Sequence, residues 1–96
     1  MPLDQQTSLH LSDLFSALSD QTRLSIISAL LEREMSVGEI AAGIGLSESA
    51  VSHQLRGLRH MRLVRPRKQG RQVFYCLADD HVAQLFQVGL EHVEQG

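Results

Sequence analysis

Apolar residues recur at helical spacing in the first third of the chain. Leu11, Leu14 and Leu18 fall at i, i+3 and i+7, so a helix over these positions would present them on one face. The pattern resumes at Leu24, shortly after Asp20, and aspartate is a favoured residue at the N-terminal cap of a helix. We therefore predict two helices joined by a short turn, the second of which begins directly after Asp20.

Two further helices are predicted close together in the middle of the chain. Ser36 and Glu39 stand at the spacing of a capping box, which predicts a brief helix from Val37 to about Gly43. Only a few residues later, Ser47 is suited to cap a fourth helix. Two short helices joined by so tight a turn are typical of a helix-turn-helix, in which the second helix reads DNA.

Beyond the fourth helix the pattern changes to that of strands. Residues 63–67 and 73–77 flank a turn at residues 68–71, and this order is typical of a β-hairpin. Pro66 suits an edge strand, because its nitrogen has no hydrogen to donate to a neighbouring strand. A hairpin of this size is not stable alone, so we expect it to pack against the helices as a wing.

A last helix is predicted from Asp79 or Asp80 almost to the C-terminus. It carries a near-heptad apolar stripe, formed by Val82, Leu85, Phe86, Gly89 and Val93. A glycine in a helix interior costs about 1 kcal/mol relative to alanine, and close approach of another backbone would account for Gly89. We expect this helix to join two copies of the chain, with packing against its own domain as the alternative.

Together these elements predict one mainly α-helical domain with a small β-hairpin, a winged helix-turn-helix that dimerises through its terminal helices. Residues 1–8 are mostly polar, so we expect a disordered tail there and a DNA-binding and dimerisation domain over residues 9–96. The single cysteine, Cys76, rules out an internal disulfide. No basic N-terminal segment precedes an apolar run, and nowhere are about eighteen apolar residues consecutive. We therefore expect a cytoplasmic protein that does not engage a membrane.

The charges of the chain are strongly segregated. Its formal net charge is −2, but seven of its nine Lys and Arg residues lie between Ser47 and Arg71, and residues 49–78 contain no Asp or Glu. Residues 49–78 therefore carry +7 and the remainder carries −9, with two bases against eleven acids. A basic segment on an acidic body is the electrostatic pattern of a protein that binds a polyanion such as nucleic acid.

The fourth helix combines an apolar back with a polar front. Val51, Leu55 and Leu58 fall at i, i+4 and i+7 and would face the core. The front carries Ser, His, Gln and Arg side chains, which bind phosphates and base edges. The candidate DNA contacts are Ser47, Ser49, Ser52, His53, Gln54 and Arg56 on this helix, and Arg65, Arg67, Lys68 and Arg71 on the hairpin. The alternatives are a merely solvated helix face and a winged-helix module that binds protein. No grouping of nucleophile, base and orienting residue indicates an enzyme.

Four segments of the chain resemble the ArsR/SmtB family. They are LSDQTRLSIISALL from Leu18, the SESAVSHQLRGLR helix, the RKQGRQVFY hairpin and the ADDHVAQLF start of the last helix. The likeness extends from about Leu14 to His92, and within the family it is greatest to the zinc-sensing SmtB and CzrA branch. The resemblance implies a homodimeric winged-helix repressor of bacteria, which leaves its operator DNA when metal binds between the two last helices. It also implies that His92 contacts the backbone near Arg62, at the end of the reading helix.

Potential metal ligands stand at both ends of the last helix. Asp79 and His81 open it, and His92 follows eleven residues after His81, about three turns later, so both histidines share one face. At about 1.5 Å per residue they lie roughly 16 Å apart, so one chain cannot close a site with both. Two antiparallel helices across a two-fold axis would bring His81 of one subunit to His92 of the other.

The sequence leaves the fourth ligand of such a site open. The family takes this ligand three residues after the second histidine, where this chain has Gln95 in place of His or Glu. The candidate ligands are therefore Asp79, His81, His92, and Glu94, Gln95 or a water molecule. Carboxylate and imidazole ligands in tetrahedral geometry suit Zn(II), with Co(II) and Cd(II) as alternatives. The second interpretation is the same repressor dimer with a non-metal signal or with no ligand.

Overall fold

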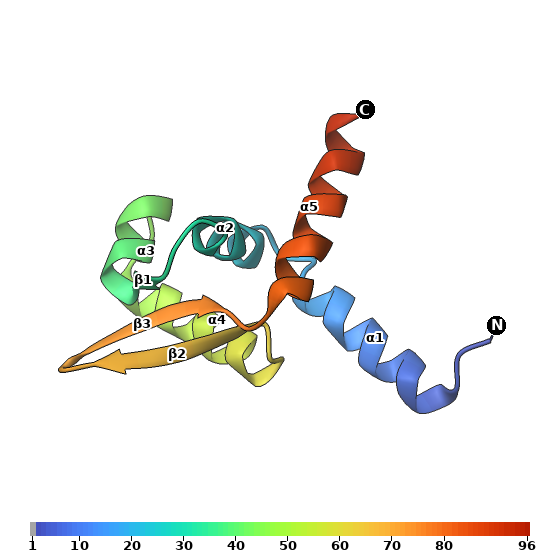
Figure 1. Ribbon diagram of the computed structural model, residues 1–96, viewed down its shortest axis with the longest axis horizontal. Coiled ribbons are helices and arrows are strands. Elements are labelled where there is room, and N and C mark those ends of the chain that lie inside the picture. Colours follow the sequence, from blue (N-terminus) through green and yellow to red (C-terminus); the bar gives the residue numbers. More distant parts are fainter. Residues whose placement is uncertain (1) are drawn as a thin grey trace.

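The computed structural model describes residues 2–96. Five helices and three strands make up this part of the chain (Figure 1). In order they are α1 (Gln5–Ala17), α2 (Gln21–Leu30), β1 (Met35–Ser36), α3 (Val37–Ile44), α4 (Glu48–His60), β2 (Val64–Gln69), β3 (Gln72–Leu77) and α5 (Asp80–Glu94). The three middle helices and the sheet form the body, from which α1 and α5 project in different directions. The predicted winged helix-turn-helix is confirmed, with α3 and α4 as the helix pair and β2 and β3 as the wing.

Side-chain caps set the starts of the middle helices where the sequence predicted them. Asp20 accepts a hydrogen bond from the backbone nitrogen of Arg23 at 3.0 Å, and Ser36 forms the full capping box with Glu39. Ser47 accepts from the backbone nitrogen of Ala50 at 3.1 Å at the start of α4. These bonds use local N–H groups that the first turn of a helix leaves without partners.

The first helix begins earlier than the hydrophobic pattern predicted. It starts at Gln5, within the tail expected over residues 1–8, because Asp4 caps it by accepting from the backbone nitrogen of Thr7 at 2.8 Å. Residues 5–8 of the expected tail are therefore helical. The cap was missed because the apolar stripe begins only one turn later, so periodicity alone placed the start of the helix there.

The sheet contains one strand more than the predicted hairpin. Its order is β1-β3-β2, all antiparallel, so β2 is an edge strand, as Pro66 indicated. A two-residue turn joins β2 to β3, and Gly70 in this turn has a φ of 62°, a conformation that glycine adopts without steric cost. The added strand β1 is two residues long and pairs Met35 with Tyr75. A strand of two residues shows no alternation, so the sequence pattern could not reveal it.

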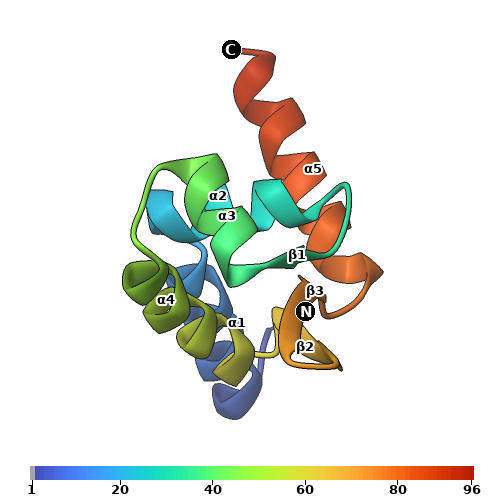
Figure 2. The same ribbon diagram turned by 90° about the vertical axis from the view of Figure 1, so that its left-hand side faces the viewer.

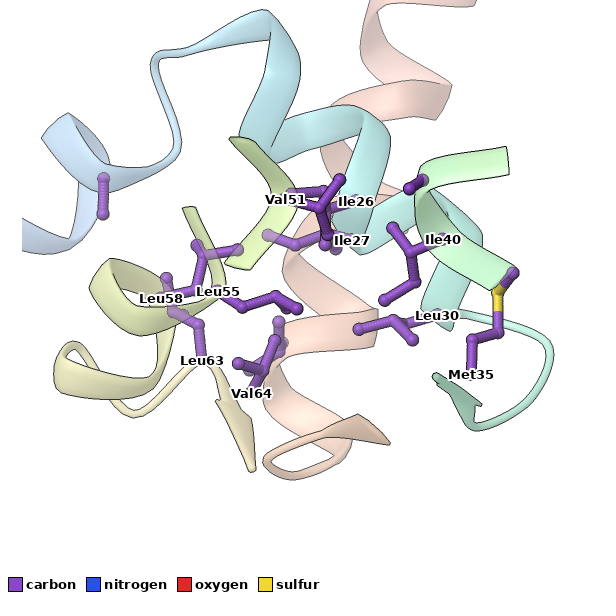
Figure 3. Packing of buried hydrophobic residues seen from close by; sticks show 13 residues of the cluster. Ile26, Ile27, Leu30, Met35, Ile40, Val51, Leu55, Leu58, Leu63 and Val64 are labelled. Carbon is purple, nitrogen blue, oxygen red and sulfur yellow. The ribbon is translucent and has the colours of Figure 1, made fainter. Parts of the chain in front are cut away.

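The core lies between α2, α3, α4 and the base of the wing (Figure 3). Its fully enclosed side chains come from all four elements, and they include the three residues of α4 that helical spacing predicted to face inward. The largest of these buried side chains are Ile26, Ile27, Ile40, Val51, Leu55, Leu58 and Val64. Because α4 enters this core with a whole face, its opposite face is held outward in a fixed orientation.

The terminal helices keep much of their apolar surface exposed. Phe15 on α1 is 53% exposed and Val93 on α5 is 74% exposed. An apolar groove of about 410 Å³ lies between α1, α2 and α5, and both side chains line it. At Gly89, no atom of the described residues beyond its helix neighbours lies within 4 Å of where a β-carbon would stand. The single chain thus contains no close approach that would require this glycine.

Candidate nucleic-acid interface and metal ligands

The exposed face of α4 carries most of the predicted DNA contacts. Ser49, His53 and Arg56 are exposed, and Ser52 is half-buried at the edge of the same face. These side chains lie opposite Val51, Leu55 and Leu58, whose complete burial fixes the rotation of the helix about its axis. Ser47 stands just before the helix, where its oxygen caps the first turn and its hydroxyl hydrogen remains available to donate.

Gln54 lies at the edge of this exposed face, where it lines a surface groove with His53 and Arg56. Its side chain is half-buried, and its Oε1 accepts a hydrogen bond from Nε of Arg23, on α2, at 3.1 Å. Position 54 follows the buried Val51 by three residues, so helical geometry turns it toward the neighbouring helix. We predicted that Gln54 faces the groove with the other polar residues of α4, but in the structure its amide oxygen is engaged by Arg23. Arg23 itself was not among the predicted site residues.

The wing tip is the most open part of the basic segment. Lys68 precedes the turn, Arg71 lies within it, and both are exposed. Within residues 2–96, neither side chain has a carboxylate at salt-bridge distance. The tip therefore presents two cations per chain whose charges are not neutralised by any acid of the described residues.

Arg67, by contrast, is already paired with an acid. Its Nε and Nη2 atoms donate to Oε1 of Glu34 at 3.0 and 2.8 Å, and Nε also donates to Oε2 at 2.9 Å. The guanidinium lies over the ring of Phe74, 5.5 Å from its centroid. These hydrogen bonds hold the pKa of Glu34 below its ordinary value of 4.5. Glu34 was not predicted as part of the site, because it reaches the wing only through the pairing of β1 with β3.

Arg65 lies on the same outer face of the wing as Arg67. Its Nε donates to the sulfur of Cys76, its cross-strand neighbour, at 3.4 Å. Cys76 is a free thiol and is half-buried on this face of the wing. Arg65 itself is exposed and has no carboxylate at salt-bridge distance among the described residues.

Two of the predicted metal ligands meet at the start of α5. His81 Nδ1 lies 3.7 Å from Oδ1 of Asp79, and the imidazole is 90% exposed. The same carboxylate oxygen caps α5 by accepting from the backbone nitrogen of Val82 at 3.2 Å. Oxygen and imidazole nitrogen are the donor types that zinc accepts, so these two residues fit one half of a metal site and face solvent, where another chain can reach them.

His92 stands at the far end of α5, and one chain alone does not complete a site. No group of three or more His, Cys, Asp or Glu residues within residues 2–96 is close enough to hold a metal ion. The helix stays regular through Glu94, with Gln95 as its C-terminal cap. At about 100° per residue, Glu94 points about 200° around the axis from His92, whereas Gln95 lies within about 60° of it. A carboxylate from Glu94 would therefore require the last turn to unwind.

Of the described residues, none forms a helix with the length and apolar character that crossing a lipid bilayer requires.

The chain is similar to known regulators of transcription. The family described as "Bacterial regulatory protein, arsR family" matches residues 20–65. A transcriptional repressor SmtB homolog of Synechocystis is 47% identical over 99% of this chain and 70% of its own length. A cadmium resistance transcriptional regulatory protein CadC homolog of Staphylococcus aureus is 38% identical over 94% of this chain and 75% of its own.

Among solved structures, the chain is similar to the homodimeric winged helix-turn-helix DNA-binding domain of Mb0332 from Mycobacterium bovis. The TM-score is 0.87 at 27% sequence identity, and the match covers 99% of this chain and 90% of the other. This agreement extends over all five helices and the sheet, including the projecting terminal helices.

Proposed function

Because the chain belongs to the arsR family of bacterial regulatory proteins, we propose that it is a transcriptional repressor that binds double-stranded operator DNA as a homodimer. Members of this family are regulators of transcription and not enzymes. The observation that carries the proposal is that α4, with its exposed polar face, and the basic wing lie in the same half of the molecule (Figure 2). A duplex can therefore meet both at once.

On this proposal, α4 lies in the major groove. Ser49, Ser52, His53 and Arg56 face base edges, and the hydroxyl of Ser47 donates to a phosphate. Hydroxyl, imidazole and guanidinium groups are the side-chain types that read bases and bind phosphates. The wing supplies the sequence-independent part of the affinity through phosphate contacts, which release counterions from the duplex. Its contacts are Lys68 and Arg71 at the tip, with Arg65 and Arg67 beside them.

The exposed terminal helices support the homodimer. Phe15, Leu90 and Val93 form an apolar surface that a second copy of the chain would cover. Gly89 lies on α5 within this surface and has open space beside it, so a second α5 helix can approach its backbone closely. Dimerisation through α1 and α5 also leaves α4 and the wing of both subunits free for DNA.

We also propose that metal binding regulates the affinity of the dimer for DNA. Asp79 and His81 of one subunit and His92 of the other would hold Zn(II), with Co(II) and Cd(II) as alternatives. Asp79 and His81 already lie side by side, and a relative carries cadmium resistance in its name. Zinc bound there would link the two subunits, and the affinity for DNA would fall. By thermodynamic linkage, DNA must then weaken zinc binding by the same factor.

The test uses the purified protein and a random-sequence duplex library. The wild-type protein should enrich a duplex from this library, and its affinity should fall steeply with salt. Titration calorimetry with zinc, with and without the enriched duplex, then measures the coupling. Absence of enrichment would refute DNA binding, and equal zinc affinity in both titrations would refute metal-dependent release.

One observation favours a second candidate function. Because the regular last turn directs Glu94 away from His92, the chain offers an amide, Gln95, where a strong zinc ligand would be expected. The second candidate is therefore the same DNA-binding dimer responding to a non-metal signal or to none. Zinc binding that is weak and leaves the affinity for the enriched duplex unchanged would support it.

A further inference from the structure

Arg23 connects three helices through one half-buried side chain. Its Nε donates to Oε1 of Gln54 on α4 at 3.1 Å, and its Nη1 donates to the backbone carbonyl of Ala17 at 3.1 Å. Its own backbone nitrogen donates to Asp20 at the start of α2. The same guanidinium therefore links the end of α1 to the middle of the proposed reading helix. The guanidinium group is planar and rigid, so the direction of one hydrogen bond fixes the direction of the other.

The Ala17 carbonyl is well suited to accept such a hydrogen bond. Ala17 is the last residue of α1 and is buried, and the carbonyls of a last helical turn have no partner within the helix. Phe15, two residues earlier, lies on the exposed apolar surface of the terminal helices. Arg23 thus bridges from the helix that would meet the second subunit to the helix that would enter the groove.

We infer that Arg23 is a positioning residue that fixes the spacing between the two reading helices of the dimer. This inference rests on the proposed function. In a symmetric dimer the distance between the two reading helices selects the spacing of the half-sites on DNA. The core residues of α4 hold its inner face, whereas on the side of α1 an open cleft lies between the two helices. Beside this cleft, the hydrogen bonds from Arg23 to Ala17 and Gln54 would hold the tilt of α4 against α1.

Gln54 has a different role on this inference from that of its neighbours. It is the acceptor that receives Arg23, and it contacts no base. On the same inference Arg23 contacts no phosphate, because its Nε and Nη1 atoms are engaged by Gln54 and Ala17. The loss of either side chain should relax the spacing preference while leaving the number of phosphate contacts unchanged.

The experiment measures binding to the duplex that the wild-type protein enriches, and to versions with one or two base pairs inserted at its centre. Wild type should bind the inserted duplexes much more weakly. Arg23→Ala, Arg23→Lys and Gln54→Ala should bind the enriched duplex up to about tenfold more weakly and lose most of the discrimination against insertion. The double variant Arg23→Ala/Gln54→Ala should be no weaker than either single variant, because both remove one link. Arg33→Ala, which removes a cation outside the link, is the charge control and should keep the wild-type preference.

A second set of readouts separates positioning from direct contact. For a positioning residue the salt dependence of binding stays that of wild type, whereas loss of a phosphate contact lowers its slope by about one. Gln54→Glu keeps an acceptor for Arg23, so it should retain the spacing preference in spite of its added negative charge. If Gln54 read a base, this variant would instead change the preferred base.

The outcomes distinguish the inference from the function on which it rests. A wild-type protein that enriches no duplex overturns both. A wild-type protein that binds, together with Arg23 and Gln54 variants that keep its spacing preference, overturns the inference alone. Additive losses in the double variant, or a lower salt slope in Arg23→Lys, also overturn it. Circular dichroism checks folding, and if Arg23→Ala is unfolded the decision rests on Gln54→Ala, which leaves the bond to Ala17 in place.

Discussion

Replacing Glu34 by glutamine should strengthen the binding of DNA by the wing. In the wild-type protein the guanidinium of Arg67 donates to both carboxylate oxygens of Glu34, so the acid neutralises one of the cations of the wing. Glutamine is nearly isosteric and keeps one oxygen acceptor, but it has no charge. Arg67 would then stay over Phe74 and become a cation free to pair with a phosphate.

The size of the effect follows from counterion release. Each phosphate contact changes the slope of log Kobs against log salt by about −0.9 on duplex DNA. A dimer gains two such contacts, so the slope should become steeper by up to about 1.8. The gain is an upper limit, because the pair is accessible, with side chains 48% and 37% exposed, and a phosphate competes for Arg67 even in the wild type.

The assay is fluorescence anisotropy of a labelled duplex over a series of salt concentrations. Glu32→Gln is the matched control, since it makes the same change of charge two residues earlier at an exposed side chain outside the pair with Arg67. The reasoning is refuted if Glu34→Gln and Glu32→Gln give the same affinity and the same slope. Such a result would mean that pairing with Glu34 does not reduce the binding of Arg67 to phosphate.

The same substitution has a signature in stability against pH. Arg67 lowers the pKa of Glu34 in the folded chain below 4.5. A lowered carboxyl pKa gives stability that is fully present above the ordinary pKa and is lost as pH falls through the lowered value. Chemical denaturation over this acidic range should therefore show a smaller loss of the free energy of unfolding in Glu34→Gln than in wild type.

Three further changes test other parts of the molecule. Lys68→Ala with Arg71→Ala should weaken binding to all sequences alike and lower the salt slope by about 0.9 for each lost contact; unchanged anisotropy curves would contradict the assignment of the wing tip. Arg62 has a φ of 61° between α4 and the wing, so Arg62→Gly should raise the free energy of unfolding by about 0.5 to 1 kcal/mol in urea titration, and a decrease would show that the conformation is not strained. His81→Ala and His92→Ala homodimers should each bind no zinc, whereas their mixed dimer should bind one ion, because one of its two sites keeps both histidines. A mixed dimer that binds none would place the metal site elsewhere.

Local sequence patterns predicted the five helices, the hairpin and most of the exposed face of α4, but not strand β1 or the first turn of α1. Helical periodicity and capping are local properties, carried by residues three or four positions apart, so the caps at Asp20, Ser36 and Ser47 followed from spacing alone. The burial of Val51, Leu55 and Leu58 was predicted for the same reason, and it directs Ser49, His53 and Arg56 outward.

Contacts between distant parts of the chain set which polar side chains are free to bind DNA. Gln54 is engaged by Arg23, 31 positions away, and Arg67 by Glu34, 33 positions away. Neither pairing can be predicted from the spacing of neighbouring residues. The first depends on how α2 packs on α4, and the second depends on the two-residue strand β1. At the end of α5, the sequence offered both Glu94 and Gln95 as candidate ligands. The regular last turn places Gln95, and not Glu94, on the side of the helix that carries His92. The sequence shows which side chains can bind DNA or metal, but whether each one is free to do so depends on contacts that form only when the chain folds.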